Sequence, residues 1–209
     1  MFFIKMEIVS NNPLIRIYDN FITDDECEFI INISKDNMVR ANVSDPSIDI
    51  KTYNGRTNSS YWIDLDKYEL MKQIAIRISK TIGLSNYRNF ENFQVIHYLK
   101  NQEYKYHYDA YDKTEVEKYR QYCSERGNRL MTVLCYINDV EKGGGTGFDS
   151  LSDGSEELIV EPKKGRMVVF QNVHLDGTLH TKSRHAGLPI EEGEKWAFNL
   201  WVRERPIPQ

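Results

Sequence analysis

Hydrophobic residues recur every three or four positions in two early segments, residues 24–34 and residues 65–82. This spacing places the apolar side chains on one face of an α-helix. Before the first segment, Thr23 and Glu26 have the spacing of a capping box, in which a hydroxyl and a carboxylate satisfy backbone N–H groups of the first turn. Gly83 follows the second segment, where a helix commonly ends. The pattern therefore predicts two amphipathic helices.

The remaining pattern is typical of strands. Short runs rich in β-branched and aromatic residues are separated by turn signals such as Gly143-Gly144-Gly145. Residues 41–60 are polar and predict a long loop or an irregular hairpin. Strands after helices indicate a mainly β (α+β) fold, a β-sandwich or barrel with helices covering one side. The predicted strands are 13–18, 92–99, 103–110, 129–137, 157–161, 166–171 and 194–203.

Length and composition narrow the classes of protein. A chain of 209 residues fits one domain, and a net charge of −4 argues against a nucleic-acid partner that needs a broad basic surface. Cys27, Cys123 and Cys135 form no C-x-x-C pair, which favours a reducing compartment. No signal peptide is evident at the first residues, and no run approaches the roughly 20 apolar residues of a membrane span. We expect a soluble, cytoplasmic protein with no membrane partner.

One pair of residues suggests metal chemistry. On a strand, His107 and Asp109 stand at i and i+2 and therefore point to the same side. A histidine from another strand would complete a two-histidine, one-carboxylate face, which suits iron(II) and leaves coordination positions open. An H-x-D pair alone also occurs by chance on surface strands. The chain has five histidines: His97, His107, His174, His180 and His185.

A lysine in the last predicted strand is the second candidate. On the strand 194–203, Lys195 shares a face with Ala197, Asn199 and Trp201. A lysine that points inward beside apolar residues needs an anionic partner, such as the carboxylate of a bound ligand. Alternatively, Lys195 lies at the strand end and extends its ammonium group to water.

The sequence resembles a known family in several motifs. His107-x-Asp109, His185-Ala186-Gly187 and Gly193-Glu194-Lys195-Trp196, in that order, look like the prolyl 4-hydroxylase branch of the 2-oxoglutarate (2OG)- and iron(II)-dependent dioxygenases. The resemblance extends over most of residues 13–203. Its further motifs are Asn20-Phe21 to Cys27, Arg56-Thr57, Tyr98-x₅-Tyr104, Gly127-Asn128-Arg129 to Val140, Gly143 to Phe148, and Pro162 to Phe170.

The resemblance implies a role for each matching residue. Iron would be bound by His107, Asp109 and His185; the last is preferred over His180 because Ala-Gly follows it, as in the family. Lys195 would bind the distal carboxylate of 2OG, and Arg56 would belong to a substrate-side loop. Gly145 departs from the family, which more often has Glu there. The residues expected around the cosubstrate are Tyr98, Thr146, Tyr136 and Trp201.

The resemblance also implies a fold and a reaction. We expect a double-stranded β-helix, also called a jelly roll, over about 91–205, with a helical N-terminal support over about 13–90, in one domain spanning 1–209. The expected reaction is 4-hydroxylation of prolyl residues in a peptide or protein, with O₂ consumed, succinate and CO₂ released, and L-ascorbate as reductant. Alternatives are the same chemistry on a lysyl residue, a free amino acid or a nucleobase, and a non-catalytic metal-binding jelly-roll module. The segments 41–58 and 147–157 are expected to act as lids.

Overall fold

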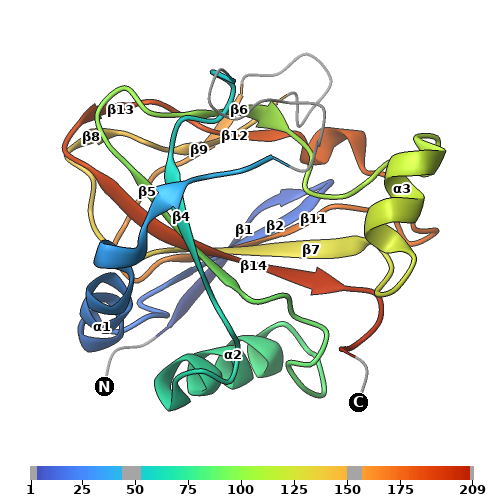
Figure 1. Cartoon of the computed structure of the whole chain (residues 1–209), viewed down its shortest axis with the longest axis horizontal. Coiled ribbons are helices and arrows are strands. Elements are labelled where there is room, and N and C mark those ends of the chain that lie inside the picture. The colour runs from blue at the N-terminus through green and yellow to red at the C-terminus, as the bar shows by residue number, and fades with distance from the viewer. Residues whose placement is uncertain (1–3, 44–52, 150–156, 208–209) are drawn as a thin grey trace.

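The protein is built around two facing antiparallel sheets, shown in Figure 1. The computed structural model describes residues 4–43, 53–149 and 157–207. The larger sheet contains, in spatial order, β1 (Lys5–Asn11), β2 (Leu14–Asp19), β11 (Met167–Gln171), β7 (Arg129–Tyr136), β14 (Lys195–Arg203), β5 (Phe93–Tyr98), β4 (Ser59–Ile63) and β3 (Val39–Arg40).

The smaller sheet faces the larger one and has four strands. They are β10 (Leu158–Val160), β9 (Thr146–Phe148), β12 (His185–Gly187) and β6 (Tyr104–His107), and a separate pair joins β13 (Ile190–Glu192) to β8 (Lys142–Gly143). Every pairing between these strands is antiparallel. This confirms the predicted jelly roll.

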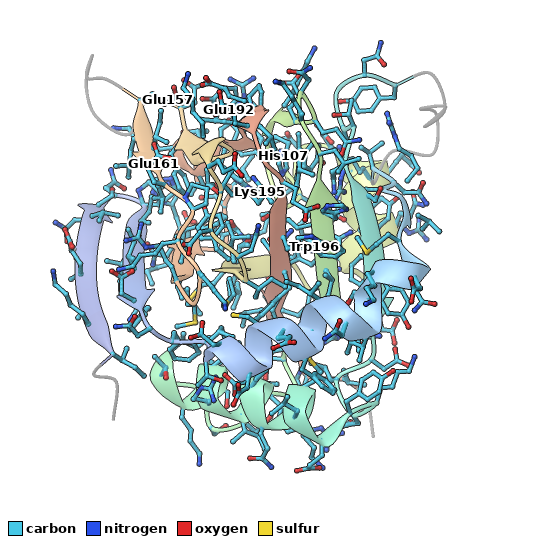
Figure 2. All side chains as sticks on the ribbon, turned by 90° about the vertical axis from the view of Figure 1, so that its left-hand side faces the viewer. His107, Glu157, Glu161, Glu192, Lys195 and Trp196 are labelled. Atoms are coloured by element: carbon cyan, nitrogen blue, oxygen red, sulfur yellow. The ribbon has the colours of Figure 1, made fainter. Side chains whose placement is uncertain are left out.

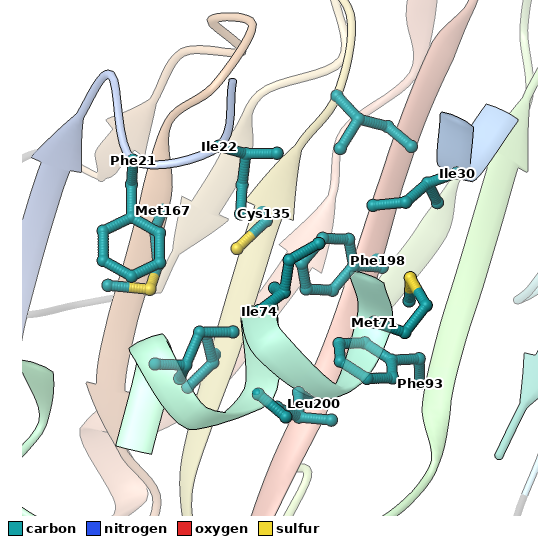
Figure 3. Packing of buried hydrophobic residues seen from close by; sticks show 14 of the residues in the cluster. Phe21, Ile22, Ile30, Met71, Ile74, Phe93, Cys135, Met167, Phe198 and Leu200 are labelled. Atoms are coloured by element: carbon teal, nitrogen blue, oxygen red, sulfur yellow. The ribbon is translucent and has the colours of Figure 1, made fainter. Parts of the chain in front are cut away.

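Two helices cover the outer face of the larger sheet. They are α1 (Asp24–Ser34) and α2 (Glu69–Thr81); a third helix, α3 (Val116–Cys123), and two 3₁₀ turns, Lys35–Asn37 and Thr181–Ser183, complete the helical segments of the described residues. Figure 3 shows Met71 and Ile74 of α2 packed against Phe93, Phe198 and Leu200 of the sheet. This core closes the face of the sheet away from the smaller sheet.

Side chains alternate between the two faces of the central strands, so the larger sheet packs against the helices on one face and against the smaller sheet on the other. In β7, Val133 and Cys135 pack in the core beneath the helices, whereas Leu134 and Tyr136 belong to the core between the two sheets. In β14 the residues beneath the helices are Trp196, Phe198, Leu200 and Val202. The other face of β14 therefore carries Lys195, Ala197, Asn199 and Trp201 toward the smaller sheet, as the period of two predicts.

The predicted capping box is present at the start of α1. The Thr23 hydroxyl accepts a hydrogen bond from the Glu26 N–H at 3.3 Å, and the Glu26 carboxylate accepts one from the Thr23 N–H at 2.9 Å. Glu26 also forms a bidentate ion pair with Arg77 of α2, with N–O distances of 2.8 and 2.7 Å. One carboxylate therefore caps α1 and joins it to the neighbouring helix.

We expect Thr23→Ala to lower the free energy of unfolding by about 1 kcal/mol, because the N–H groups of the first turn lose their acceptor. The measurement is the urea midpoint followed by circular dichroism. Thr23→Ser keeps the hydroxyl and should stay within a few tenths of a kcal/mol of the parent. Equal losses in both variants would contradict the capping role.

Several element predictions were incomplete. The N-terminal part is not only a helical support, because β1 to β4 join the larger sheet. The loop or irregular hairpin predicted over 41–60 ends where β4 begins at Ser59 and pairs with β3. The full strand β4 was missed because its polar Ser60 faces the cavity described below. The predicted strand 103–110 ends at His107, so Asp109 lies just beyond it. Parts of the two expected lids, residues 44–52 and 150–156, lie outside the described residues.

Candidate active site

The structure brings His107, Asp109 and His185 together between the two sheets. Their ligand atoms all lie within 4.8 Å of one another. His107 and His185 are direct cross-strand partners, because β6 and β12 pair in that register. Asp109 follows β6 after one intervening residue, and its carboxylate lies 3.7 Å from Nε2 of His107 and 3.5 Å from Nε2 of His185. Strand pairing therefore assembles the three side chains from segments far apart in sequence.

The two imidazoles are oriented by backbone carbonyl groups. Nδ1 of His107 lies 2.7 Å from the Lys105 carbonyl oxygen, and Nδ1 of His185 lies 2.9 Å from that of Ser183. A carbonyl can only accept, so both rings carry their hydrogen on Nδ1 and present the Nε2 lone pair to the shared space. Two neutral imidazoles and one carboxylate on one side of a point are the donor set of a non-haem iron(II) site. The residues present therefore fit this metal.

The carboxylate is held by a hydroxyl from the larger sheet. Thr132 of β7 donates to Oδ2 of Asp109 at 2.6 Å, and the Asn172 side-chain amide in turn donates to the Thr132 hydroxyl at 2.8 Å. All three groups are buried. Such partners fix the orientation of a metal-binding carboxylate and tune its affinity.

Thr132→Val is therefore expected to weaken iron binding and turnover by about 10- to 100-fold, the usual effect of losing a partner of a metal ligand. Iron affinity is measured by competition with a chelator, and turnover by release of succinate. Thr132→Ser retains the hydroxyl and serves as the control, with values near those of the parent. If Val and Ser variants behave alike, the hydroxyl does not position Asp109.

Burial and charge set the protonation of Asp109 and His185. Burial alone would raise the pKa of the Asp109 carboxyl, but His185 and His107 hold it well below its ordinary value. Burial lowers the pKa of His185 to about 4. Near neutral pH the carboxylate is therefore charged and His185 is neutral, which are the forms that bind a metal.

A cavity of about 570 Å³ opens onto these residues. Lys195 of β14 lines it and is only 2% exposed, and Figure 2 places it near His107 in the upper middle of the molecule. Its ammonium donates to the Gly144 carbonyl oxygen at 2.8 Å and lies 4.3 Å from the centre of the Tyr98 ring. No carboxylate of the described residues forms an ion pair with it. The alternative of a lysine extending to water is therefore wrong.

This burial has an electrostatic consequence. It lowers the pKa of Lys195 to about 7, since an unpaired ammonium is unfavourable away from water. Tyr98, the cross-strand partner of Lys195, directs a hydroxyl with no hydrogen bond to any described residue into the same region. The cavity thus offers a cation and a donor to one anionic ligand.

Comparison with known proteins identifies the family. Residues 93–203 match the family described as the 2OG-Fe(II) oxygenase superfamily. The chain is 34% identical over 215 residues to "Probable prolyl 4-hydroxylase 8" of Arabidopsis thaliana, covering 94% of this chain and 70% of the relative. It is 32% identical to "Prolyl 4-hydroxylase 2" of the same plant, covering 95% and 70%. The chain belongs to the 2OG-Fe(II) oxygenase superfamily.

Solved structures agree with this assignment. The viral collagen prolyl hydroxylase of Paramecium Bursaria Chlorella virus-1, in complex with 2OG, superposes with a TM-score of 0.70 at 26% identity, covering 93% of this chain and 98% of that one. A prolyl hydroxylase of Trichoplax adhaerens superposes with a TM-score of 0.66 at 18% identity and supports the fold alone. The chain is thus a prolyl 4-hydroxylase-like, 2OG-dependent dioxygenase.

The other residues expected around the cosubstrate lie at two depths, on the cavity wall and behind it. Tyr98, Thr146 and Trp201 line the cavity, but Tyr136 does not. Tyr136 lies behind Thr146, with 2.6 Å between their hydroxyl oxygens, and donates to the Val160 carbonyl. Tyr136 therefore does not line the cavity itself, and it reaches the cavity wall only through its contact with Thr146.

Trp201 offers a free donor to the cavity. Its side chain is 5% exposed, and its indole N–H has no acceptor among the described residues. The ring is stacked beneath the Arg129 guanidinium, whose central carbon lies 3.9 Å from the ring centre. Trp201 also lies directly across from Thr132, the residue that holds Asp109. Trp201 therefore lies on the same inner face as Thr132, close to the candidate metal ligands, and its role at the cosubstrate stays a prediction.

Arg56 is a second buried cation of the cavity wall. It is 6% exposed, and its guanidinium donates to the Asn42 carbonyl at 2.6 Å, to Asn58 at 3.1 Å and to Gln94 at 3.2 Å. It lies 4.4 Å from the centre of the Tyr104 ring. Only neutral acceptors surround it among the described residues, so positive charge is available on this wall.

The departure at Gly145 lies in the turn before Thr146. The left-handed φ values of this turn fall at Gly143 (76°) and Gly144 (74°), whereas Gly145 has none. This turn delivers the Gly144 carbonyl to Lys195. The replacement of the family's Glu at Gly145 therefore leaves the lysine contact in place.

The rival histidines of the oxygenase have other partners. His180 stacks on His174 at 4.1 Å between ring centres, and its Nε2 lies 2.8 Å from the Asn12 side chain. His97 stacks on Trp196 and contacts Glu194. Within the described ranges, the possible metal-binding cluster contains none of these three histidines.

Sequence reasoning missed Thr132 and the charged group around Glu91. Thr132 lies two positions from Leu134 and four from Tyr136 in β7, so the period of two already placed it on the inner face. A hydroxyl in that apolar strand was the available signal. Glu91 forms ion pairs with Arg129 and Arg203, at 2.7 and 2.6 Å, which join segments distant in sequence. No local pattern predicts such a group.

Proposed function

We propose that this oxygenase hydroxylates prolyl residues at the 4-position in a peptide or protein. The observation that carries the proposal is the buried, unpaired Lys195 in the same cavity as His107, Asp109 and His185. A cation with no counter-ion calls for an anionic ligand, and the distal carboxylate of 2OG supplies one. The similarity to prolyl 4-hydroxylases supports the choice of substrate.

In this proposal each side chain has a distinct task. His107, Asp109 and His185 hold iron(II), while Thr132 fixes the carboxylate. Iron(II), when bound, couples O₂ and 2OG to hydroxylation of a C–H bond, with release of succinate and CO₂ and with L-ascorbate as reductant. The groups that anchor 2OG and line its site are Lys195, Tyr98, Thr146 and Trp201.

The cavity mouth supports a peptide as substrate. Aromatic side chains surround it, among them Trp62 at 45% and Tyr108 at 37% exposed. Aromatic-lined grooves suit proline-rich segments, whose rings pack on flat apolar faces and whose extended conformation costs little entropy to bind. Arg56 adds donors for backbone carbonyls of such a peptide.

The test is to incubate the iron-loaded protein with 2OG, L-ascorbate and a panel of proline-rich peptides. We expect a mass gain of one oxygen atom per modified peptide and matching succinate, with no gain when the target proline is replaced by alanine. If a lysyl peptide, a free amino acid or a nucleobase drives succinate release while no prolyl peptide is modified, the substrate assignment fails. Iron binding without turnover of any of these would favour the binding-module alternative.

A further inference from the structure

Strand β1 is a free edge of the larger sheet. It pairs with β2 on one side and with no described strand on the other. In Figure 2 it forms the left-hand margin of the molecule. An edge strand presents a row of unpaired N–H and C=O groups that can pair with another strand. None of its residues lines the cavity of the candidate active site.

The free edge carries an apolar row on one face. Ile4, Met6 and Ile8 stand at alternate positions and are 47%, 51% and 49% exposed. Natural edge strands usually avoid such a row, because it invites association. On the other face, Lys5 and Glu7 are exposed and form no ion pair with any described residue. Among the described residues of one copy, neither the row nor the two charges therefore have a partner.

We propose that β1 pairs antiparallel with β1 of a second copy, about a two-fold axis through Met6. In such an arrangement only residues on the same face can stand opposite each other, so the axis must pass through a residue. An axis through Lys5 or Glu7 would place like charges in direct opposition, which destabilises a strand pair. An axis through Met6 places Lys5 opposite Glu7 twice and Ile4 opposite Ile8 twice.

The shape of the strand is compatible with this centre. The register of β1 on β2 shifts between Ile8 and Ser10, which marks a bulge. A bulge bends the strand and ends regular pairing. Regular pairing of β1 on β2 therefore runs from Lys5 to Ile8. The axis that the charges select, through Met6, lies within this regular part of the strand.

The expected association is weak. An interface confined to one strand from each copy is at the small end of specific interfaces. We therefore expect a concentration-dependent dimer with a dissociation constant in the micromolar range.

The experiment is sedimentation velocity of the full chain over a concentration series up to about 100 µM, a range that covers micromolar association. We expect the parent to shift from monomer to dimer. Glu7→Lys places lysines opposite each other in both pairs and should raise the dissociation constant at least tenfold. The double variant Lys5→Glu/Glu7→Lys restores opposite charges and should restore the dimer.

Glu192→Lys is the charge-matched control on the exposed strand β13 and should dimerise as the parent does. Hydrogen exchange adds a backbone readout: amides within residues 5–8 should gain protection as concentration rises. If the parent stays monomeric at all concentrations, the proposal is wrong, and a partner of the β1 edge would have to be a different protein. A dimer unaffected by Glu7→Lys would place the interface elsewhere, and a double variant that remains monomeric would refute the register.

Discussion

Asp109→Ala is expected to abolish turnover, with a loss on the order of 10³-fold or more, equivalent to about 4 kcal/mol of transition-state stabilisation. Asp109 supplies the only carboxylate of the candidate iron site among the described residues. Without it the site consists of two imidazoles, so the dication loses both a ligand and its charge balance. Succinate release with a prolyl peptide measures turnover, and chelator competition measures iron affinity.

The control must separate iron loss from unfolding. Removal of Asp109 leaves the Thr132 hydroxyl without its acceptor, but it also removes a buried charge that faces two histidines. We therefore expect the metal-free variant to remain folded, with a thermal midpoint close to that of the metal-free parent. Added iron should raise the midpoint of the parent and not that of the variant. A variant that stays folded and keeps parental turnover would remove Asp109 from the iron site.

The sequence predicted the parts of this site that depend on local periodicity. The inner face of the last strand was correct to the residue, because β14 is long and regular and alternation leaves one choice for Lys195. The strand 103–110 was too long, since the chain leaves the sheet after His107 to bring Asp109 toward Thr132. That bend is dictated by a contact across 23 residues, which no local pattern contains.

The short strands are the other part of the fold that the sequence did not predict. The strands β9 and β12 have only three residues each, too few for alternation to be recognised. Yet β12 sets His185 directly opposite His107. Gly187 is explained only by the folded chain: a Cβ there would lie 3.1 Å from the Tyr98 hydroxyl. The glycine after His185-Ala186 therefore leaves room for the Tyr98 hydroxyl, which a Cβ would crowd.

Lys195→Met should weaken 2OG binding by about 100-fold or more, because the ligand carboxylate would be buried without its cation, a loss of about 3–5 kcal/mol. The same change should stabilise the ligand-free protein by about 1–3 kcal/mol, since it replaces an unpaired buried ammonium by an apolar chain of similar length. Weaker 2OG binding together with a more stable ligand-free protein would indicate that the Lys195 charge serves to bind a ligand. Isothermal titration with 2OG and urea unfolding measure the two effects.

The lowered pKa of Lys195 determines how 2OG affinity and stability change with pH. The pKa of Lys195 in the ligand-free protein is lowered to about 7, so the ammonium is charged below that pH and neutral above it. Affinity of the parent for 2OG should therefore fall as pH rises above 7, approaching about tenfold per pH unit. The stability gain of Lys195→Met should be greatest below pH 7 and vanish toward about pH 10.4, where an unfolded lysine also loses its proton.

Lys195→Arg is the matched control, because a guanidinium stays charged throughout this range. It should bind 2OG more weakly than the parent on account of its size, but its affinity should not fall between pH 7 and pH 9. Since the charge on residue 195 is the only difference in titration between the two proteins, a flat profile would assign the parental slope to Lys195. An equal slope in both proteins would assign it to another group, and parental 2OG affinity in Lys195→Met would remove the lysine from the cosubstrate site.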